Sequence, residues 1–91
     1  MAAPYSYTPL GFVQLNISTA TGLGTIPNGA SMALIVCETA NVRWRDDGIA
    51  PTSSVGMLFS AGQEFQYSGN LQGIQFIAVS GSPVLDVSFY K

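Results

Sequence analysis

Apolar and polar residues alternate along several short stretches of the chain, a pattern that is typical of half-buried β-strands. Near the N-terminus, Val13, Leu15 and Ile17 would share one face of such a strand. Further along, Val42 and Trp44 are predicted to point inward. The run MALIVC is apolar on both faces, as expected for a central strand. The predicted strands before the C-terminal region are residues 12–18, 32–38, 42–45, 57–60 and 64–67.

The C-terminal part of the chain predicts a β-hairpin. The turn SGSP at residues 80–83 separates two apolar stretches, and tight closure would pair Val79 with Val84 and Ile77 with Asp86. One face of this hairpin would then be apolar throughout. The other face would carry Ile77, Val79 and Val84 among polar residues, which is too apolar for open water and too polar for a deep core. We therefore expect a protein contact there.

The whole pattern predicts an all-β fold. No window of helical length shows a sustained helical period, and Gly and Pro recur at short intervals. Such a chain is expected to form a small antiparallel β-sandwich or barrel, jelly-roll-like in type. We assign residues 12–91 to this single domain and residues 1–11 to an extended N-terminal arm, which holds two prolines, two tyrosines and no charge. Tyr5 and Tyr7 of the arm are expected to dock on an adjacent subunit.

Charged side chains are scarce: the 91 residues hold three basic and five acidic ones, which is 9% of the chain. A small domain that stands alone in water carries roughly a quarter charged residues. A surface this poor in charge predicts that much of it faces protein, so we expect the chain to be a subunit of a homo-oligomer or a larger assembly. Half of the charges lie together, at Arg43, Arg45, Asp46 and Asp47.

This VRWRDDG segment has two interpretations. In the first, Asp-Gly makes a turn, an Asp caps backbone N–H groups, and Arg43 or Arg45 pairs with a carboxylate while Trp44 anchors the core. In the second, the two arginines together with Asp46 and Asp47 form the polar centre of an interface, because Arg and Trp contribute strongly to binding where they are desolvated. The two interpretations can coexist, with an intrachain pair presented at a subunit boundary.

Composition excludes several classes of partner. The net charge of −2 provides no basic field for phosphates, so nucleic-acid binding is not expected. The apolar run at residues 32–37 is far shorter than the ~20 residues of a membrane helix, so no membrane partner is expected. The N-terminus lacks the layout of a secretory signal, and a single cysteine suits a reducing cytoplasm. Assembly in a reducing cytoplasm is therefore expected.

Catalytic and cofactor sites are not expected either. The chain has no histidine, so the usual general base for a Ser or Cys nucleophile is missing. Cys37 lies in the most apolar predicted strand, where a thiol is normally inert. The DDG segment lacks the alternating acidic spacing of a calcium loop. We therefore predict no enzyme activity, no cofactor and no bound metal.

The VRWRDDG segment, followed by Pro51, Thr52 and Gly56, resembles small structural proteins encoded by tailed bacteriophages and prophages. The resemblance spans residues 26–90, and this chain has Ile49 where the similar proteins have Thr. It implies a phage-encoded structural protein located in the virion, assembled in the host bacterial cytoplasm. It implies no functional residues, because the similar proteins are largely uncharacterised.

These observations together predict a capsid decoration or cement protein that acts by protein–protein binding, with itself and the major capsid protein as partners. A ring protein at the head–tail junction or in the tail fits the same sequence. The alternative from another class is a carbohydrate-binding module of a tail fibre or spike, which would stack sugars on exposed aromatics. The residues that such a module would use are Tyr5, Tyr7, Trp44, Tyr67 and Asp47.

Overall fold

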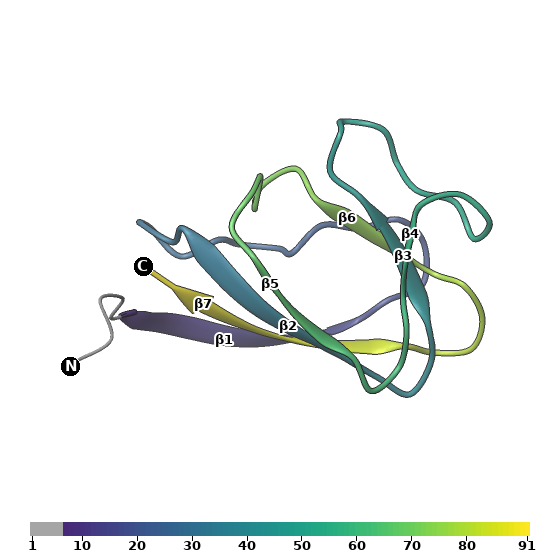
Figure 1. Cartoon of the computed structure of the whole chain (residues 1–91), viewed down its shortest axis with the longest axis horizontal. Helices are drawn as coiled ribbons and strands as arrows, with labels where there is room; N and C mark the ends of the chain where they lie inside the picture. Colours follow the sequence, from purple (N-terminus) through teal and green to yellow (C-terminus); the bar gives the residue numbers. More distant parts are fainter. Residues whose placement is uncertain (1–6) are drawn as a thin grey trace.

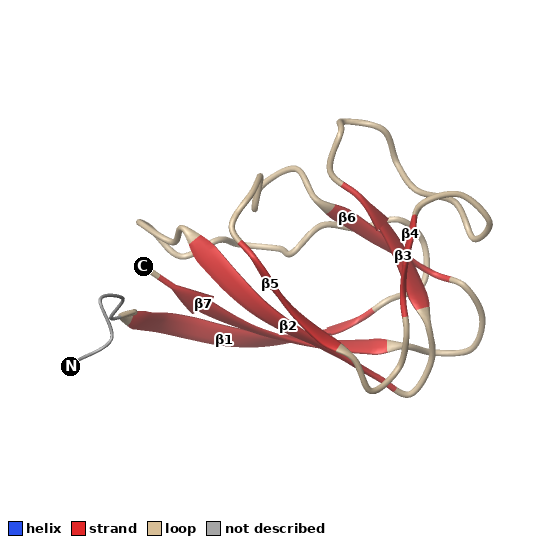
Figure 2. Ribbon diagram, viewed as in Figure 1, coloured by secondary structure: helices blue, strands red, loops and turns tan. Residues whose placement is uncertain are grey.

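The alternating stretches form seven β-strands in two antiparallel sheets that pack face to face (Figures 1 and 2). This computed structural model describes residues 7–91, so Tyr5 of the predicted arm lies outside the described residues. The larger sheet has the strand order β1-β7-β2-β5 and the smaller sheet the order β4-β3-β6. The strands are β1 (Pro9–Asn16), β2 (Met32–Glu38), β3 (Val42–Arg45), β4 (Met57–Phe59), β5 (Glu64–Tyr67), β6 (Gln75–Ala78) and β7 (Val84–Tyr90).

The strand order is that of a jelly roll with one strand reduced to a single bridge. Thr21 bridges to Phe76, so the segment after β1 runs along the free side of β6. The Thr21 amide donates to the Phe76 carbonyl at 2.9 Å, and the Phe76 amide donates to the Thr21 carbonyl at 2.8 Å. This segment takes the place of a fourth strand in the smaller sheet. The prediction of an all-β, jelly-roll-like sandwich is confirmed.

The core lies between the two sheets and follows the alternation of the sequence. Along β7, Leu85, Val87 and Phe89 are buried and the residues between them are half-buried. Phe76 of the smaller sheet and Ile35 of the larger sheet are both completely buried in this core. Burial of such side chains provides most of the favourable free energy of a fold of this size, at about 25 cal/mol per Å² of apolar surface.

The predicted C-terminal hairpin is wrong, because β6 and β7 belong to different sheets. The turn between them crosses from one layer of the sandwich to the other, where the Val79 amide donates to the Asn41 carbonyl and the Ile17 amide to the Pro83 carbonyl, both at 3.0 Å. Pro83 has no N–H and so cannot complete a tight hairpin ladder. In both arrangements the same alternate residues face the core, which is why the inward set was predictable although the pairing was not.

This correction also divides the predicted contact face. Ile77 lies on the outer face of the smaller sheet, in register with Arg43 of β3. Val84 lies on the outer face of the larger sheet, between Asn16 of β1 and Glu38 of β2. Ile77 and Val84 therefore do not form one surface, and Val79 belongs to the turn that joins the layers.

The start of the domain also differs from the predicted boundary. Strand β1 begins at Pro9, so the last residues assigned to the arm pair with β7. Thr8 and Lys91 exchange two backbone hydrogen bonds, of 3.1 and 2.9 Å. The Tyr7 ring meets the Tyr90 ring edge-on at a centroid distance of 6.2 Å. Tyr7 thus contacts its own sandwich, and it remains half exposed. Its docking on an adjacent subunit stays a prediction.

Candidate protein-binding site

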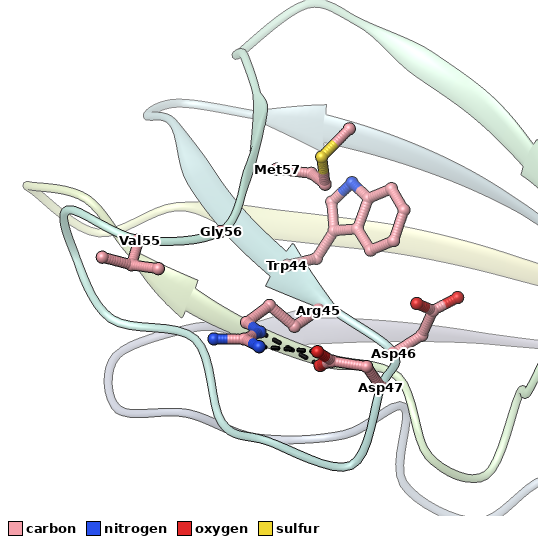
Figure 3. A pocket seen from close by; sticks show the side chains of 7 residues that line it. All are labelled: Trp44, Arg45, Asp46, Asp47, Val55, Gly56 and Met57. Carbon is pink, nitrogen blue, oxygen red and sulfur yellow. Dashed lines mark hydrogen bonds and ion pairs between the residues drawn. The ribbon is translucent and has the colours of Figure 1, made fainter.

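The VRWRDDG segment forms strand β3 and continues into a long loop, residues 46–56, which returns to the sheet as β4 (Figure 3). Within this β3–β4 loop, the Thr52 amide donates to the Val55 carbonyl at 2.8 Å. The Thr52 hydroxyl accepts a hydrogen bond from the Val55 amide at 2.9 Å. Thr side chains favour turns because they bond the backbone in this way. Pro51, at the start of this turn, is buried.

Gly56 allows the loop to pass close to β3. Its φ is +143°, and a Cβ added there would lie 3.1 Å from the Cβ of Arg43 and 3.2 Å from the Cβ of Pro51. The carbonyl oxygen of Trp44 would be equally close, at 3.2 Å. A side chain therefore fits neither the space nor the backbone conformation. The Pro-Thr-Gly part of the motif thus has a structural explanation in the course of the loop.

Arg43 holds the same loop by its guanidinium group. Its Nη1 donates to the Gly56 carbonyl at 2.9 Å, and its Nε donates to the Ser53 carbonyl at 3.2 Å. Hydrogen bonds from a charged donor are about twice as strong as neutral ones. Arg43 therefore acts mainly within the chain, as a tie between β3 and the β3–β4 loop.

Asp46 also acts within the chain, at the junction of the two sheets. The Tyr67 hydroxyl of β5 donates to Asp46 Oδ2 at 2.7 Å and accepts a hydrogen bond from the Asn70 amide at 2.7 Å. The pKa of Tyr67 is raised, mainly because the side chain is buried and, to a smaller extent, because its hydroxyl bonds Asp46. Because Asp46 follows a strand of the smaller sheet, this bond joins the two layers of the sandwich.

Arg45 and Asp47 form a different kind of contact, an ion pair at the surface. Arg45 Nη2 donates to Asp47 Oδ2 at 2.6 Å and Nε donates to Oδ1 at 3.0 Å, so the pair is bidentate. The hydrogen bond from Arg45 is the main reason that the pKa of Asp47 is lowered. The Asp47 side chain remains 54% exposed, which leaves the pair accessible to a partner.

Trp44 provides a rigid aromatic wall beside this ion pair. Its indole stacks on Phe65 of β5 at a centroid distance of 5.6 Å and meets Tyr67 edge-on at 6.2 Å. Figure 3 shows Met57 beside the indole, and it shows the Asp46 and Asp47 carboxylates directed apart. These side chains enclose an open hollow of about 400 Å³. Its lining residues are Trp44, Arg45, Asp46, Asp47, Val55, Gly56 and Met57.

Apolar side chains are exposed along the same loop and the strand that follows it. Ile49, Val55, Met57 and Leu58 are between 53% and 60% exposed. Among the described residues, two further large apolar side chains are at least half exposed, Tyr7 and Phe12. An apolar surface of this kind next to an ion pair is typical of sites that bind protein. Leu58 is in register with Arg43 and so lies on the outer face of β4, away from the hollow. We name Val55 and Met57, together with the hollow, the β4 patch.

The sequence located this site only in part. Arg43, Arg45, Asp46 and Asp47 all lie here, but two of them act within the chain. The apolar members of the β4 patch were not predicted as site residues. A signal for them exists: in VGMLF three apolar residues follow one another, although strand β4 lies at the edge of its sheet and cannot bury them all.

Cys37 is held within the core. The Cys37 side chain is completely buried, its thiol donates to the Ala40 carbonyl at 3.1 Å, and burial, with a smaller effect of Glu38, raises its pKa. Within residues 7–91, no cluster of three or more potential metal ligands occurs. The same residues include no helix that is long and apolar enough to cross a membrane.

Comparison of the chain with protein-family models, with curated proteins and with solved structures found no match. The assignment of function therefore depends on the chemistry of the β4 patch and on the composition of the chain.

Proposed function

We propose that this chain is a structural subunit of a tailed-bacteriophage particle, a capsid decoration protein that binds other virion proteins through the β4 patch. The observation that carries the proposal is the gathering of exposed Val55 and Met57 beside the accessible Arg45–Asp47 pair. Apolar side chains supply affinity when they are covered, and the fixed charge pair supplies orientation. The mechanism is binding alone.

The geometry of the patch favours a protein partner because the site is pre-formed. Trp44 is fixed by Phe65, and the loop that carries Val55 is fixed by the two hydrogen bonds of Arg43. A fixed surface loses little conformational entropy on binding, which favours affinity. Many copies on one particle would strengthen weak single contacts by avidity.

The location on a phage particle rests on the resemblance of VRWRDDG and the residues after it to phage structural proteins, and on the low content of charge. The partner that we propose is the major capsid protein, with further copies of this chain alongside. A position in a ring at the head–tail junction or in the tail would use the same chemistry.

The proposal is tested by adding the purified protein to phage heads, and separately to tails, that lack it, and by measuring occupancy by mass spectrometry. We expect saturable binding to heads, and at least a tenfold loss of affinity in Met57→Glu. The matched control is Ile77→Glu, which places the same charge on the outer face of β6, away from the hollow. Absence of binding to both heads and tails would overturn the proposal.

A second candidate function, carbohydrate binding, is favoured by one observation. Trp44 and Asp47 line the same hollow, and an aromatic ring beside a carboxylate is suited to a sugar. Against it, Tyr67 is buried with its hydroxyl bonded to Asp46, and the indole face towards Phe65 is covered. Binding on a glycan array that is lost in Trp44→Phe and kept in Met57→Glu would favour the sugar over the protein partner.

A further inference from the structure

Strand β1 is the outermost strand of the larger sheet and pairs on one side only, with β7. Figure 1 shows it along the border of the sheet. The directions of its backbone groups follow from the ladder: the Ile17 amide donates to the Pro83 carbonyl at 3.0 Å, next to the register pair of Asn16 and Val84. Residues that bond the same neighbouring strand alternate in an antiparallel ladder. Leu15, like Ile17, therefore directs its N–H and C=O towards β7.

The other side of the sheet gives the same assignment. The Cys37 amide donates to the Gln63 carbonyl at 2.9 Å, and the Cys37 carbonyl accepts from the Gly62 amide at 2.7 Å, so Cys37 bonds towards β5. The register partner of Cys37 on β7 is Leu85. Because Cys37 directs its backbone groups away from β7, Leu85 directs its own N–H and C=O away from β2, towards β1. Leu85 is in register with Leu15. Two independent sets of bonds thus agree on the direction of the β1 backbone.

Phe12, Gln14 and Asn16 therefore direct their N–H and C=O groups away from β7, into the open edge. Outside the β1–β7 ladder, no hydrogen bond of the described residues uses any of these backbone groups. The three side chains lie on the outer face of the sheet and are exposed, Phe12 by 66%. Such a row of free donors and acceptors is a template for another strand.

The other edges of the two sheets are protected and this one is not. Strand β4 has only three residues, and β5 carries the charge of Glu64 on a short strand. The free side of β6 is covered through Thr21 and Ser18. Strand β1 has eight residues and no charged side chain; its bulge, between Pro9 and Gly11, is confined to its first residues. Charge, proline and bulges are the usual means of blocking an edge.

We propose that two copies of this chain pair through β1, antiparallel about a two-fold axis at Gln14, to form one continuous sheet with four strands from each copy. In this register Phe12 of each copy lies opposite Asn16 of the other, and the two Gln14 residues lie opposite each other. The edge-directed backbone groups of Phe12, Gln14 and Asn16 are then all hydrogen-bonded. A shift by one ladder repeat leaves one of them unpaired or brings the bulge near Pro9 into the ladder.

A second copy is the partner that this edge suits. The edge is complementary to itself, as a two-fold interface requires, because its free donors and acceptors alternate along the strand. Without a charged side chain on β1, no like charges oppose each other across the axis. Asp86, the nearest acidic residue in the register, accepts a 2.8 Å hydrogen bond from the Gln14 side chain of its own copy. The inference deepens the self-assembly part of the proposed function, but it rests on β1 and not on the β4 patch.

The experiment is a measurement of molar mass by light scattering and sedimentation over a range of concentrations. We expect twice the monomer mass for the wild type and for Gln14→Ala, which keeps the edge N–H. Gln14→Pro removes that N–H from a position that faces solvent in the monomer, where proline is tolerated, and is expected to remain monomeric. A monomeric wild type at millimolar concentration, or a Gln14→Pro dimer as tight as that of Gln14→Ala, would overturn the proposal.

Amide hydrogen exchange of the wild-type protein tests the same edge without any substitution. The amides of Phe12, Gln14 and Asn16 are expected to be slowed at least tenfold at high protein concentration, whereas the Leu15 amide, which bonds β7, is slow at every concentration. Exchange of the three edge amides that does not depend on concentration would contradict pairing through β1.

A cysteine pair tests the register. Residues directly opposite in a bonded pair have Cα atoms about 5.5 Å apart, within the range of a disulfide. Gln14→Cys should therefore cross-link two copies on mild oxidation, at least ten times faster than Asn16→Cys, and the buried Cys37 does not compete. Equal rates for the two variants would overturn the axis at Gln14. If none of these tests shows pairing while heads still bind the protein, the self-association fails and the proposed function of the β4 patch stands.

Discussion

Two Arg–Asp sets are interleaved along five residues, and they serve different purposes. Arg43 and Asp46 bond groups of the same chain, the loop carbonyls in one case and the Tyr67 hydroxyl in the other. Arg45 and Asp47 bond each other and stay at the surface of the hollow. A cluster of charged residues is therefore not one functional unit: Arg43 and Asp46, the first set, hold the loop in place, and the loop carries Arg45 and Asp47, the second set, at the surface.

The two sets also differ in what removal would leave behind. Without Arg43, two loop carbonyls lose a charged donor beside a loop that packs closely on β3. Without Arg45, the Asp47 carboxylate is left in water, which solvates it at little cost. We therefore expect Arg43 and Asp46 to determine stability, and Arg45 and Asp47 to determine binding.

Substitution of Gly56 should have the largest effect, because the first set depends on the path of the loop. In Gly56→Ala the Cβ would meet Arg43, Pro51 and the Trp44 carbonyl at a φ that side chains rarely adopt. We expect a loss of about 2–3 kcal/mol in the free energy of unfolding, measured by urea titration. The matched control is Gly48→Ala, since Gly48 also has a positive φ of 86° but has no atom within 4 Å of an added Cβ.

Gly48→Ala should cost about 1 kcal/mol, from the backbone conformation alone. An equal loss in the two variants would mean that the close approach of the loop to β3 contributes nothing.

The arginines themselves give the direct test of the division. Arg43→Ala should lower the free energy of unfolding by about 1–2 kcal/mol, because two hydrogen bonds from a charged donor are lost. Arg45→Ala should lower the melting temperature only slightly, since its partner is an exposed carboxylate. Binding to phage heads should show the reverse order once both variants are measured well below their melting temperatures.

If Arg43→Ala weakens binding more than Arg45→Ala under those conditions, the loop-holding role of Arg43 is not its main one. If neither variant changes binding, the charge pair does not orient the partner, and the apolar part of the β4 patch alone would carry the contact.

Most of the fold was predictable from alternation, because inward residues must be apolar whichever strands are neighbours. The same property explains the error at residues 75–90. Phe76 and Val87 face the core both in a hairpin and in two separate layers, so their pattern contains no information on pairing. The crossing depends on hydrogen bonds to Asn41 and Ile17, which are far apart in the chain.

The candidate site was predictable only through its charges. Nothing in the order of the residues distinguishes Asp46 from Asp47; the distinction arises because the strand directs Asp46 towards Tyr67 of the other sheet. The exposure of Met57 and Leu58 likewise depends on β4 being an edge strand, and edge position is a property of topology. Sequence patterns identify strands more readily than they identify their neighbours.

The smallest expected effect is on titration, and it tests the second set alone. Hydrogen bonding to Arg45 is the main cause of the lowered pKa of Asp47, and amide hydrogen bonds at Asp47 and Ile49 lower it further. Arg45→Gln should therefore raise this pKa towards the ordinary value of about 3.9, although not fully, because the amide bonds remain. The carboxyl carbon followed by NMR during an acid titration measures this directly.

The sign of the accompanying pH effect on stability follows from the direction of the shift. Because the pKa of Asp47 is lower in the folded chain than in the unfolded one, the ion pair contributes stability above the unfolded pKa, and this contribution is lost as the pH falls through the lowered folded pKa. The wild type and Arg45→Gln should thus differ slightly at neutral pH and converge in acid. Asp86 is the internal control: its pKa is lowered by Glu38 and Gln14, so it should not respond to Arg45→Gln. A shift of both carboxyls together would indicate a change of the whole fold, and the division between the two Arg–Asp sets would then lose its basis.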